Sequence, residues 1–328
     1  MPKKNAKAFI TTVPFATVSR EPLDLLEQAG IAAIINPLGK NMTHDDFAQF
    51  CEDVDYVIAG LPPFSEAFFE KAKKLNLIVR VGVGYDNVPF DLCKQYGVKV
   101  SYTPGAGTHA VAELTIGLLI DALRRFSFID RDLRAGGWNK YMGEMLRGKT
   151  VGIIGVGRIG KRVIELLQPF GVRILGNDLV EDAAFARAHN VTFVSKEELY
   201  RSADIISIHV SKTPSAHHMI SEKALSLMKP SAVLLNLSRG GVVDEHALYK
   251  ALVQNKIAGA ALDVYEEEPY TGPLTALDNV ILTAHVGAGT TESRRLMEVG
   301  AVEEVVRFHK GEPLQNELDP DSVLAAMK

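Results

Sequence analysis

The chain has 328 residues, of which 47% are hydrophobic and 23% charged, and its formal net charge is -4. This length and composition predict two globular domains, and the acidic balance argues against nucleic acid or an anionic membrane as a partner. With only two cysteines, neither a disulfide framework nor a paired-cysteine metal site is expected, and a cytoplasmic location fits.

The first hundred residues alternate short β-rich runs with segments of helical periodicity. The expected strands are residues 8–13, 31–35, 55–60, 77–84 and 98–102, and the expected helices lie within 22–30, 44–53, 65–74 and 89–97. This alternation predicts a parallel, doubly wound sheet. The apolar stretch near the amino terminus is interrupted by Thr11, Thr12 and Pro14, so we expect no secretory signal there. No run of about 18 apolar residues is present to span a membrane.

A proline and two glycines punctuate residues 103–107, and Thr108 is suited to cap the long apolar helix that follows. Because this helix is apolar on more than one face, we expect it to pack between domains or subunits, and a homodimer through it is predicted.

A second series of strands and helices begins at residue 149. Its strands are expected at the start of 149–167 and within 172–178, 191–194, 203–210, 232–238, 258–264 and 280–285. A helix over 291–311 then finishes the chain. The predicted boundaries give one discontinuous domain, 1–103 plus 288–328, and a second domain, 104–287.

The stretch VGIIGVGRIG places Gly155, Gly157 and Gly160 between a buried strand and an amphipathic helix. That context supports a dinucleotide site: the glycines allow a tight turn, close approach of a pyrophosphate, and close packing of helix and strand. The helix N-terminus attracts the anion. Asp178 ends the next strand, where a carboxylate binds ribose hydroxyls and repels a 2′-phosphate, so NAD is favoured over NADP.

Polar side chains follow three later strands of the same domain. Arg239, Asp263 and His285 come directly after apolar runs, and Glu268 lies on the loop that follows Asp263. Ligands of open α/β sheets bind at the carboxyl ends of the strands, so we expect these residues to gather there. Histidine can donate a proton near neutral pH, and a neighbouring carboxylate would stabilise its imidazolium form. An arginine can hold a carboxylate with its planar fork. These residue types suit reduction of a 2-oxo acid by a nicotinamide cofactor.

Four motifs in this order give the chain a family resemblance: GIIGVGRIG, LLNLSRGGVVDEHAL, AALDVYEEEP and the late histidine. The sequence resembles the D-isomer-specific 2-hydroxyacid dehydrogenases, a family that includes D-3-phosphoglycerate dehydrogenases, D-lactate dehydrogenases and glyoxylate reductases. The resemblance implies an α/β fold with two doubly wound parallel-sheet domains. Residues 1–103 plus 288–328 would form a flavodoxin-like substrate domain, and residues 104–287 a Rossmann NAD-binding domain. The family also implies closure of the two domains, with hinges near Pro104 and Gly287.

By position in the motifs, Arg239 resembles the arginine that binds the substrate carboxylate, Glu268 the acid partner and His285 the acid/base. Val83 and Gly84 match the loop whose backbone N–H groups hold the substrate carboxylate. Asp263 resembles the aspartate that meets the nicotinamide carboxamide. The remaining cofactor contacts implied by the resemblance are Thr108, Arg158, Ile159, His209, Val210, Thr213, Leu237, Ser238 and Gly287.

Departures from the family pattern bear on the substrate. Gly107 stands where members specific for phosphoglycerate often have an asparagine, and the loop VIAGLPPF lacks the arginine that many of them offer a phosphate. Arg80, Lys94 or Lys140 could compensate. These departures weaken the case for phosphoglycerate, and a D-3-phosphoglycerate dehydrogenase is kept as one alternative. A second alternative is a non-catalytic, NAD(H)-sensing binding protein like the corepressors built on this fold, although the chain has almost no flanking tails. Histidines outside the four motifs suggest no metal site.

Overall fold

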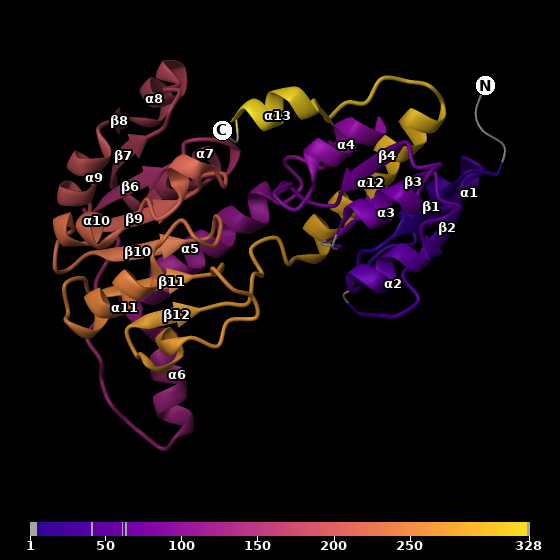
Figure 1. Ribbon diagram of the computed structural model, residues 1–328. Coiled ribbons are helices and arrows are strands. Elements are labelled where there is room, and N and C mark those ends of the chain that lie inside the picture. Colours follow the sequence, from indigo (N-terminus) through magenta and orange to yellow (C-terminus); the bar gives the residue numbers. More distant parts are fainter. Residues whose placement is uncertain (1–4, 41, 61, 63, 327–328) are drawn as a thin grey trace. The chain divides into compact units, whose positions relative to one another are not determined.

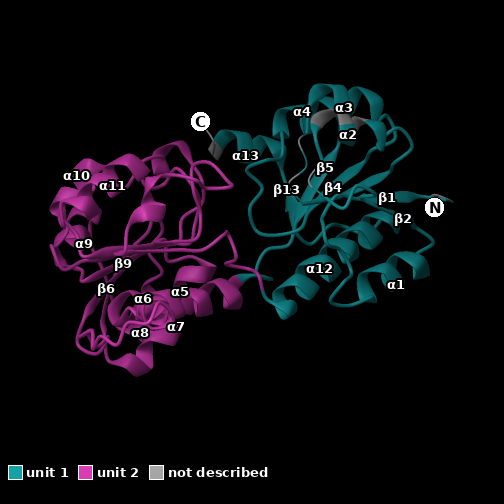
Figure 2. Ribbon diagram, turned by 90° about the horizontal axis from the view of Figure 1, so that it is seen from below, with its two compact units in different colours: residues 1–107, 290–328 teal, residues 108–289 magenta. Residues whose placement is uncertain are grey.

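The computed structural model describes residues 5–40, 42–60, 62 and 64–326, which fall into two compact units. Unit 1 comprises Met1–Gly107 and Thr290–Lys328, and unit 2 comprises Thr108–Gly289 (Figure 2). The divisions therefore follow residues 107 and 289, whereas the sequence prediction placed them after residues 103 and 287. Each unit contains one sheet with helices on its faces, so the predicted α/β class is confirmed.

Unit 1 has a six-stranded sheet of order β13-β5-β4-β3-β1-β2. All neighbouring strands are parallel except β13, which pairs antiparallel with β5. The run β2-β1-β3-β4-β5 is the flavodoxin-like strand order. The strands are β1 Lys7–Ile10, β2 Ala32–Ile35, β3 Tyr56–Ala59, β4 Leu77–Arg80, β5 Lys99–Tyr102 and β13 Glu317–Leu318. The helices are α1 Glu21–Gln28, α2 His44–Gln49, α3 Glu66–Lys71, α4 Phe90–Tyr96, α12 Thr291–His309 and α13 Pro320–Ala326 (Figure 1).

Aromatic side chains dominate the core of unit 1. Phe47 stacks on Phe68 with ring centroids 4.3 Å apart, and Phe9 lies 5.9 Å from Phe47. All three are fully buried, and they join the central strands to α2 and α3. Cys51 lies in the same core beyond the end of α2, which is shorter than predicted, and both cysteines are buried and form no disulfide.

Unit 2 has a seven-stranded, wholly parallel sheet of order β12-β11-β10-β9-β6-β7-β8. Numbered within the unit, this order contains the 3-2-1-4-5-6 arrangement of a Rossmann fold. The strands are β6 Thr150–Ile154, β7 Arg173–Asn177, β8 Val191–Phe193, β9 Ile205–Ile208, β10 Val233–Asn236, β11 Gly259–Leu262 and β12 Val280–Leu282. The helices are α5 Thr108–Arg124, α6 Phe126–Arg134, α7 Arg158–Leu167, α8 Ala183–His189, α9 Lys196–Ser202, α10 Glu222–Leu227 and α11 Glu245–Val253. Short 3-10 turns span Gln168–Phe170, Pro214–Ala216 and Pro273–Ala276.

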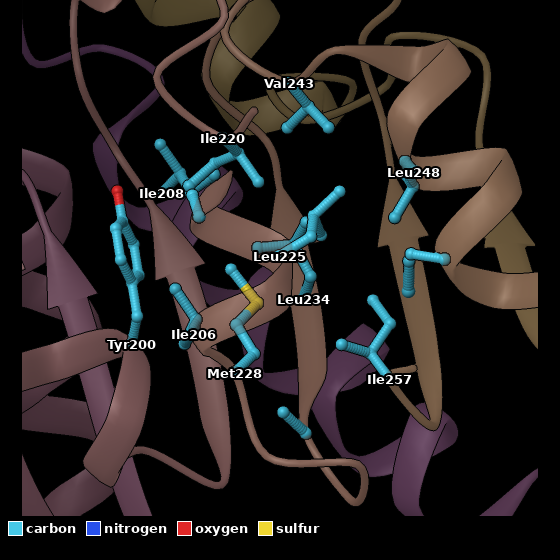
Figure 3. Packing of buried hydrophobic residues seen from close by; sticks show 14 of the residues in the cluster. Tyr200, Ile206, Ile208, Ile220, Leu225, Met228, Leu234, Val243, Leu248 and Ile257 are labelled. Carbon is cyan, nitrogen blue, oxygen red and sulfur yellow. The ribbon is translucent and has the colours of Figure 1, made fainter. Parts of the chain in front are cut away.

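Both faces of the unit 2 sheet are buried, which is why its strands read as continuous apolar runs. Alternate residues of one strand enter different cores: Leu234 faces the cluster under α9, α10 and α11, whereas Val233 and Leu235 face the cluster under α5 and α7. Figure 3 shows the first cluster, in which Ile206 and Leu234 of neighbouring strands lie beside Met228.

The long apolar helix predicted after Pro104 is α5, and a second helix that the sequence analysis did not predict, α6, follows it. Helix α5 begins at Thr108 and ends at Arg124. Thr108 is therefore the first residue of the helix and not its cap. Arg125 then adopts a left-handed conformation with φ 58°, and the Asp121 carboxylate accepts a hydrogen bond from the Ser127 N–H at 2.9 Å. A non-glycine residue at positive φ interrupts an α-helix, so α6 starts in a new direction.

The prediction that the helix over 291–311 finishes the chain is wrong, because β13 and α13 follow it. Glu304 of α12, which is only 2% exposed, holds the segment that leads into β13 in place. Its carboxylate accepts hydrogen bonds from the Ser101 hydroxyl at 2.5 Å and from the backbone N–H groups of Gln315 and Asn316 at 3.1 and 3.2 Å. These contacts bring the segment before β13 against β5.

Among the residues that the structure describes, none of the helices combines the length and hydrophobicity that crossing a membrane requires.

We predict that Glu304→Ala lowers the free energy of unfolding by about 2–3 kcal/mol, because it leaves several partly buried donors without their acceptor. The midpoint of urea unfolding measures the effect. Glu303→Ala, a change at the exposed neighbouring position, is the matched control and should leave the midpoint in place. Equal midpoints for the two variants would show that Glu304 does not anchor this segment.

Candidate functional site at the strand ends of unit 2

The glycine-rich loop joins β6 to α7, and two of its glycines are required by contacts within the protein. Gly155 has φ 92°, and a Cβ there would lie 2.5 Å from the His209 carbonyl oxygen. A Cβ on Gly160 would lie 2.0 Å from the Gly155 carbonyl oxygen. Gly157 is different, because a Cβ there would meet nothing within 4 Å. No side chain caps α7, which begins at Arg158 and continues with Ile159. The loop therefore leaves open space beside a helix N-terminus, which fits a bound phosphate group.

Asp178 follows β7 and lies beside this loop. One carboxylate oxygen accepts a hydrogen bond from the Val156 N–H at 2.6 Å, and the other accepts one from the Val180 N–H at 3.2 Å. Leu179 and Val180 are 94% and 80% exposed. An acidic group flanked by exposed apolar side chains is suited to a ribose with its attached base.

His209 follows β9, and its backbone lies against Gly155 of the glycine-rich loop. Its Nε2 is 2.8 Å from the Ser207 hydroxyl, whereas its Nδ1 is buried and has no hydrogen-bond partner in the structure. Burial lowers the pKa of His209 to about 4, so the ring is neutral at neutral pH. Val210 is partly buried beside it, and the Thr213 hydroxyl lies 3.1 Å from that of Ser215. A buried nitrogen without a partner indicates a missing hydrogen-bonding group at this position.

Asn236, the last residue of β10, shapes the loop that carries Arg239. Its side-chain oxygen accepts hydrogen bonds from the backbone N–H and hydroxyl of Ser238 at 3.1 and 2.6 Å, and its amide donates to the Arg239 carbonyl at 3.0 Å. Leu237 and Ser238 are each 6% exposed. The Arg239 guanidinium donates to the Ser238 carbonyl at 2.8 Å. The loop therefore has a defined conformation at the point where the arginine leaves it.

Asp263, which follows β11, holds the turn that carries His285. Its buried carboxylate accepts hydrogen bonds from the Thr283 hydroxyl at 2.6 Å and from the N–H groups of Val286 and Gly287, each at 2.8 Å. The His285 N–H donates to the Asp263 carbonyl at 2.9 Å. His285 adopts φ 52°, which costs a non-glycine residue about 1–2 kcal/mol. The hydrogen bonds to Asp263 compensate for this strain.

His285 and Glu268 form a direct pair. The Nδ1 atom of His285 lies 2.8 Å from Oε2 of Glu268, and Oε1 of the same carboxylate accepts a hydrogen bond from the Tyr265 N–H at 3.1 Å. The Tyr265 ring is buried, and its hydroxyl donates to the Leu262 and Thr283 carbonyls at 3.1 and 2.9 Å. The second ring nitrogen of His285, Nε2, makes no hydrogen bond with any described residue, and the side chain is 49% exposed. That nitrogen can therefore exchange a proton with a ligand.

The loops that carry Arg239 and Glu268 are in contact. A Cβ on Gly240 would lie 1.7 Å from the Tyr265 carbonyl oxygen, so the backbones approach as closely as glycine permits. Strands β10, β11 and β12 are also neighbours in the sheet. The structure thus places the predicted residues Arg239, Asp263, Glu268 and His285 at one edge of unit 2.

Other predicted residues lie elsewhere. Thr108 begins α5 in unit 2, whereas Val83 and Gly84 follow β4 in unit 1. The turn before them is fixed by Gly82, which has φ 130° and donates its N–H to the Thr103 hydroxyl at 2.7 Å. Val83 is 41% exposed. Within the part of the chain that the structure describes, histidine, cysteine and acidic side chains form no group of three suited to a metal ion.

Sequence reasoning missed the residues that support the site. Asn236 could have been found, because an amide inside an otherwise apolar strand signals a specific hydrogen-bonding role. Tyr265 and Gly240 gave no such signal, since their roles depend on contacts between loops.

Comparison with known proteins adds an independent finding. The model of the family described as "D-isomer specific 2-hydroxyacid dehydrogenase, NAD binding domain" matches residues 116–287. A glyoxylate reductase of Thermococcus litoralis is 40% identical over 262 residues, which cover 77% of this chain and 79% of that protein. A D-3-phosphoglycerate dehydrogenase of Methanocaldococcus jannaschii is 37% identical over 301 residues, which cover 90% of this chain but only 57% of that protein.

Among solved structures, the D-lactate dehydrogenase of Aquifex aeolicus complexed with NAD and lactic acid superimposes with a TM-score of 0.80 and 28% identity. The match covers 93% of this chain and 96% of that one.

Proposed function

The chain belongs to the D-isomer-specific 2-hydroxyacid dehydrogenase family and is an oxidoreductase that acts with a nicotinamide cofactor. From this premise we propose that His285 is its acid/base, Glu268 the partner that orients it, and Arg239 the residue that binds the substrate carboxylate. The observation that carries this proposal is the 2.8 Å contact between Nδ1 of His285 and Glu268.

The pair assigns a role to each nitrogen of the imidazole. Glu268 accepts a hydrogen bond from the Nδ1–H group. This contact fixes the ring orientation and leaves Nε2 to carry the reacting proton. In the reducing direction, imidazolium donates this proton to the substrate carbonyl oxygen while the carbonyl carbon takes up hydride, and a 2-hydroxy acid results. NADH supplies that hydride when bound. The carboxylate of Glu268 stabilises the charged ring before the transfer.

Arg239 provides a guanidinium beside the same strand ends. Its planar fork suits two parallel hydrogen bonds to a carboxylate, and its charge polarises a neighbouring carbonyl. In unit 1, we assign the backbone N–H groups of Val83 and Gly84 to the substrate carboxylate as well, because the turn at Gly82 presents them at the end of β4. A crystal structure with a bound unreactive analogue such as oxamate tests both assignments.

The cofactor assignment rests on how well unit 2 fits a dinucleotide. The open space at Gly157, the uncapped start of α7 and the unpartnered Nδ1 of His209 each suit a bound polar group. We infer that Asp178 holds the adenosine ribose and selects NAD over NADP. We retain the other predicted cofactor contacts as part of this proposal: Thr108, Gly155, Arg158, Ile159, Gly160, Val210, Thr213, Leu237, Ser238, Asp263 and Gly287.

For the substrate we favour a short, unphosphorylated 2-oxo acid such as glyoxylate or hydroxypyruvate. Arg80, a candidate to receive a phosphate, donates from Nη1 to the Ala59 carbonyl at 3.4 Å and also contacts the Val81 carbonyl. Its guanidinium is therefore engaged with the backbone of unit 1. Leu61 and Pro63, in the loop that lacks the phosphate-binding arginine, lie outside the described residues. D-3-Phosphoglycerate remains the alternative substrate. We also propose a cytoplasmic location, which is consistent with two buried cysteines that form no disulfide.

We predict that His285→Gln lowers kcat for the preferred 2-oxo acid by about a hundredfold or more, with the Kd for NADH changed less than about twofold. Steady-state NADH oxidation with glyoxylate, hydroxypyruvate, pyruvate, 2-oxoglutarate and 3-phosphohydroxypyruvate, together with NADH titration, measures both quantities. Arg239→Lys provides a contrast, since it should raise KM for the oxo acid most strongly. Equal losses in turnover and NADH binding would make His285 structural. A wild type that binds NADH but reduces none of the five acids would favour the NAD(H)-sensing binding protein.

We predict that Asp178→Ala reduces the preference for NAD over NADP by about tenfold, because removal of one carboxylate relieves roughly 1–2 kcal/mol of repulsion with the 2′-phosphate. The ratio of kcat/KM for NADH and NADPH measures this change, with Asp182→Ala, a helix-capping aspartate on the following loop, as the control. A wild type that already prefers NADPH would contradict the role assigned to Asp178.

We further propose that the chain forms a homodimer. Helix α5 packs within unit 2 against α7 and the sheet, so its apolar residues are largely covered. Three strongly exposed apolar side chains lie instead on the segment after α6: Trp138 is 83% exposed, Met142 93% and Met145 75%. Large apolar side chains clustered in one exposed segment indicate a protein interface, and a symmetric dimer is its commonest form.

We predict that the wild type sediments at twice the mass of one chain and that Trp138→Glu sediments at the mass of one, because a buried charge opposes association. Analytical ultracentrifugation makes the measurement. Val253→Glu introduces the same charge at another exposed apolar position of unit 2 and should stay dimeric. A monomeric wild type would refute the dimer.

A further inference from the structure

The loop that carries Glu268 is also held by side chains outside the Glu268–His285 pair. Glu266 donates its backbone N–H to Oε1 of Glu245, the first residue of α11, at 2.6 Å. The Glu266 side chain makes a second hydrogen bond, because its Oε1 lies 2.9 Å from Nε2 of His218. Glu245 and His218, which come from separate segments, therefore hold the loop at Glu266, two positions before Glu268.

His218 also contacts the loop that carries Arg239. Its backbone N–H donates to the Gly241 carbonyl at 2.7 Å, and its ring stacks on that of His217 with centroids 4.0 Å apart. His218 has φ 48°, a conformation that non-glycine residues rarely adopt. The same residue thus joins the loops that follow β10 and β11.

The contact of Glu245 with Glu266 is not needed to cap its own helix. Asp244 already caps α11, because its carboxylate accepts a hydrogen bond from the Ala247 N–H at 2.9 Å. A carboxylate in the first turn adds only a weak interaction with the helix dipole. The Glu266 N–H is therefore the specific partner of Glu245.

Glu245 also contributes charge near the pair. Partial burial raises the pKa of Glu245, and the charges of Glu266, Glu267 and Glu268 raise it further, against the opposing effect of the Glu266 N–H. Electrostatic interaction is mutual, so the Glu245 carboxylate acts on Glu268 in turn. The other titratable groups of this region are Asp244, His218, Tyr265 and Tyr270.

We propose that Glu245 and His218 are positioning residues for the acid/base pair: by holding Glu266 they fix the loop from which Glu268 reaches His285. This inference rests on the function proposed above for that pair. Glu245 supplies a hydrogen-bond acceptor and a negative charge, and His218 supplies the connection to the Arg239 loop.

Four variants separate these contributions in NADH-dependent reduction of the preferred 2-oxo acid. Glu245→Ala should lower kcat by about tenfold with an unchanged Kd for NADH, because small displacements of a catalytic group are costly. Glu245→Gln keeps an acceptor oxygen for the Glu266 N–H and should retain kcat within about threefold. His218→Ala should lower kcat, and His218→Gln, which keeps a donor near the Nε2 position, should restore part of it.

Glu222→Ala is the matched control. Glu222 is also the first residue of a helix, α10, behind a capping side chain, and it is exposed. Its variant should keep the wild-type kcat. Hydrogen exchange offers a readout independent of turnover: the Glu266 amide should exchange faster in Glu245→Ala and not in Glu222→Ala.

The outcomes distinguish this inference from the proposed function. If Glu245→Ala keeps the wild-type kcat and Glu266 exchange while His285→Gln is inactive, the positioning role is overturned and the acid/base assignment stands. A loss of kcat in Glu245→Ala that is matched by equal losses in NADH affinity and unfolding midpoint also overturns it. If His285→Gln retains turnover, the proposed function fails and the positioning role falls with it.

Discussion

The hydrogen bonds between the Asp263 carboxylate and the turn 283–287 determine where His285 lies. The carboxylate is 1% exposed and accepts a hydroxyl and two backbone N–H groups. Hydrogen bonds to a charged group contribute about 1.5–3 kcal/mol each, so together they outweigh the cost of about 1–2 kcal/mol of a histidine at positive φ. Without them the turn would relax, and the imidazole would leave Glu268.

The parallel sheet of unit 2 explains how residues far apart in sequence reach this turn. Strands β10, β11 and β12 are consecutive neighbours, so the loops after them start side by side at one edge. Gly240 lets the first two loops touch, because no other residue could approach the Tyr265 carbonyl so closely. Tyr265 then donates its hydroxyl to the Leu262 and Thr283 carbonyls, which links the second loop to the third. Each loop is thus fixed by its neighbour.

Patterns that depend on local sequence predicted most of the fold and the residues that lie at the strand ends of unit 2. Strands buried on both faces, such as β9 and β10, can be recognised in the sequence as apolar runs. The order of the motifs indicated Glu268 and His285 as candidate site residues. Elements that depend on distant contacts could not be predicted from the sequence. Strand β13 has only two residues, and Glu304 holds the segment before it. The break between α5 and α6 depends on the left-handed conformation of Arg125. The same holds for Asn236 and Tyr265, whose partners are backbone atoms of a folded loop.

The exposure of the proposed acid/base pair, His285 and Glu268, explains why so many surrounding contacts orient these two side chains. The side chains of His285 and Glu268 are 49% and 35% exposed, and an ion pair this accessible contributes at most about 1 kcal/mol. Their mutual attraction alone cannot hold the ring in one direction against solvent. Hydrogen bonds to the loops must do so instead. Asp263 fixes the turn that carries His285. Tyr265, together with the contacts of Glu245 and His218 to Glu266, fixes the loop that carries Glu268. The proposed acid/base group has to remain accessible to a substrate, so the geometry of the pair is set by the loops that carry it.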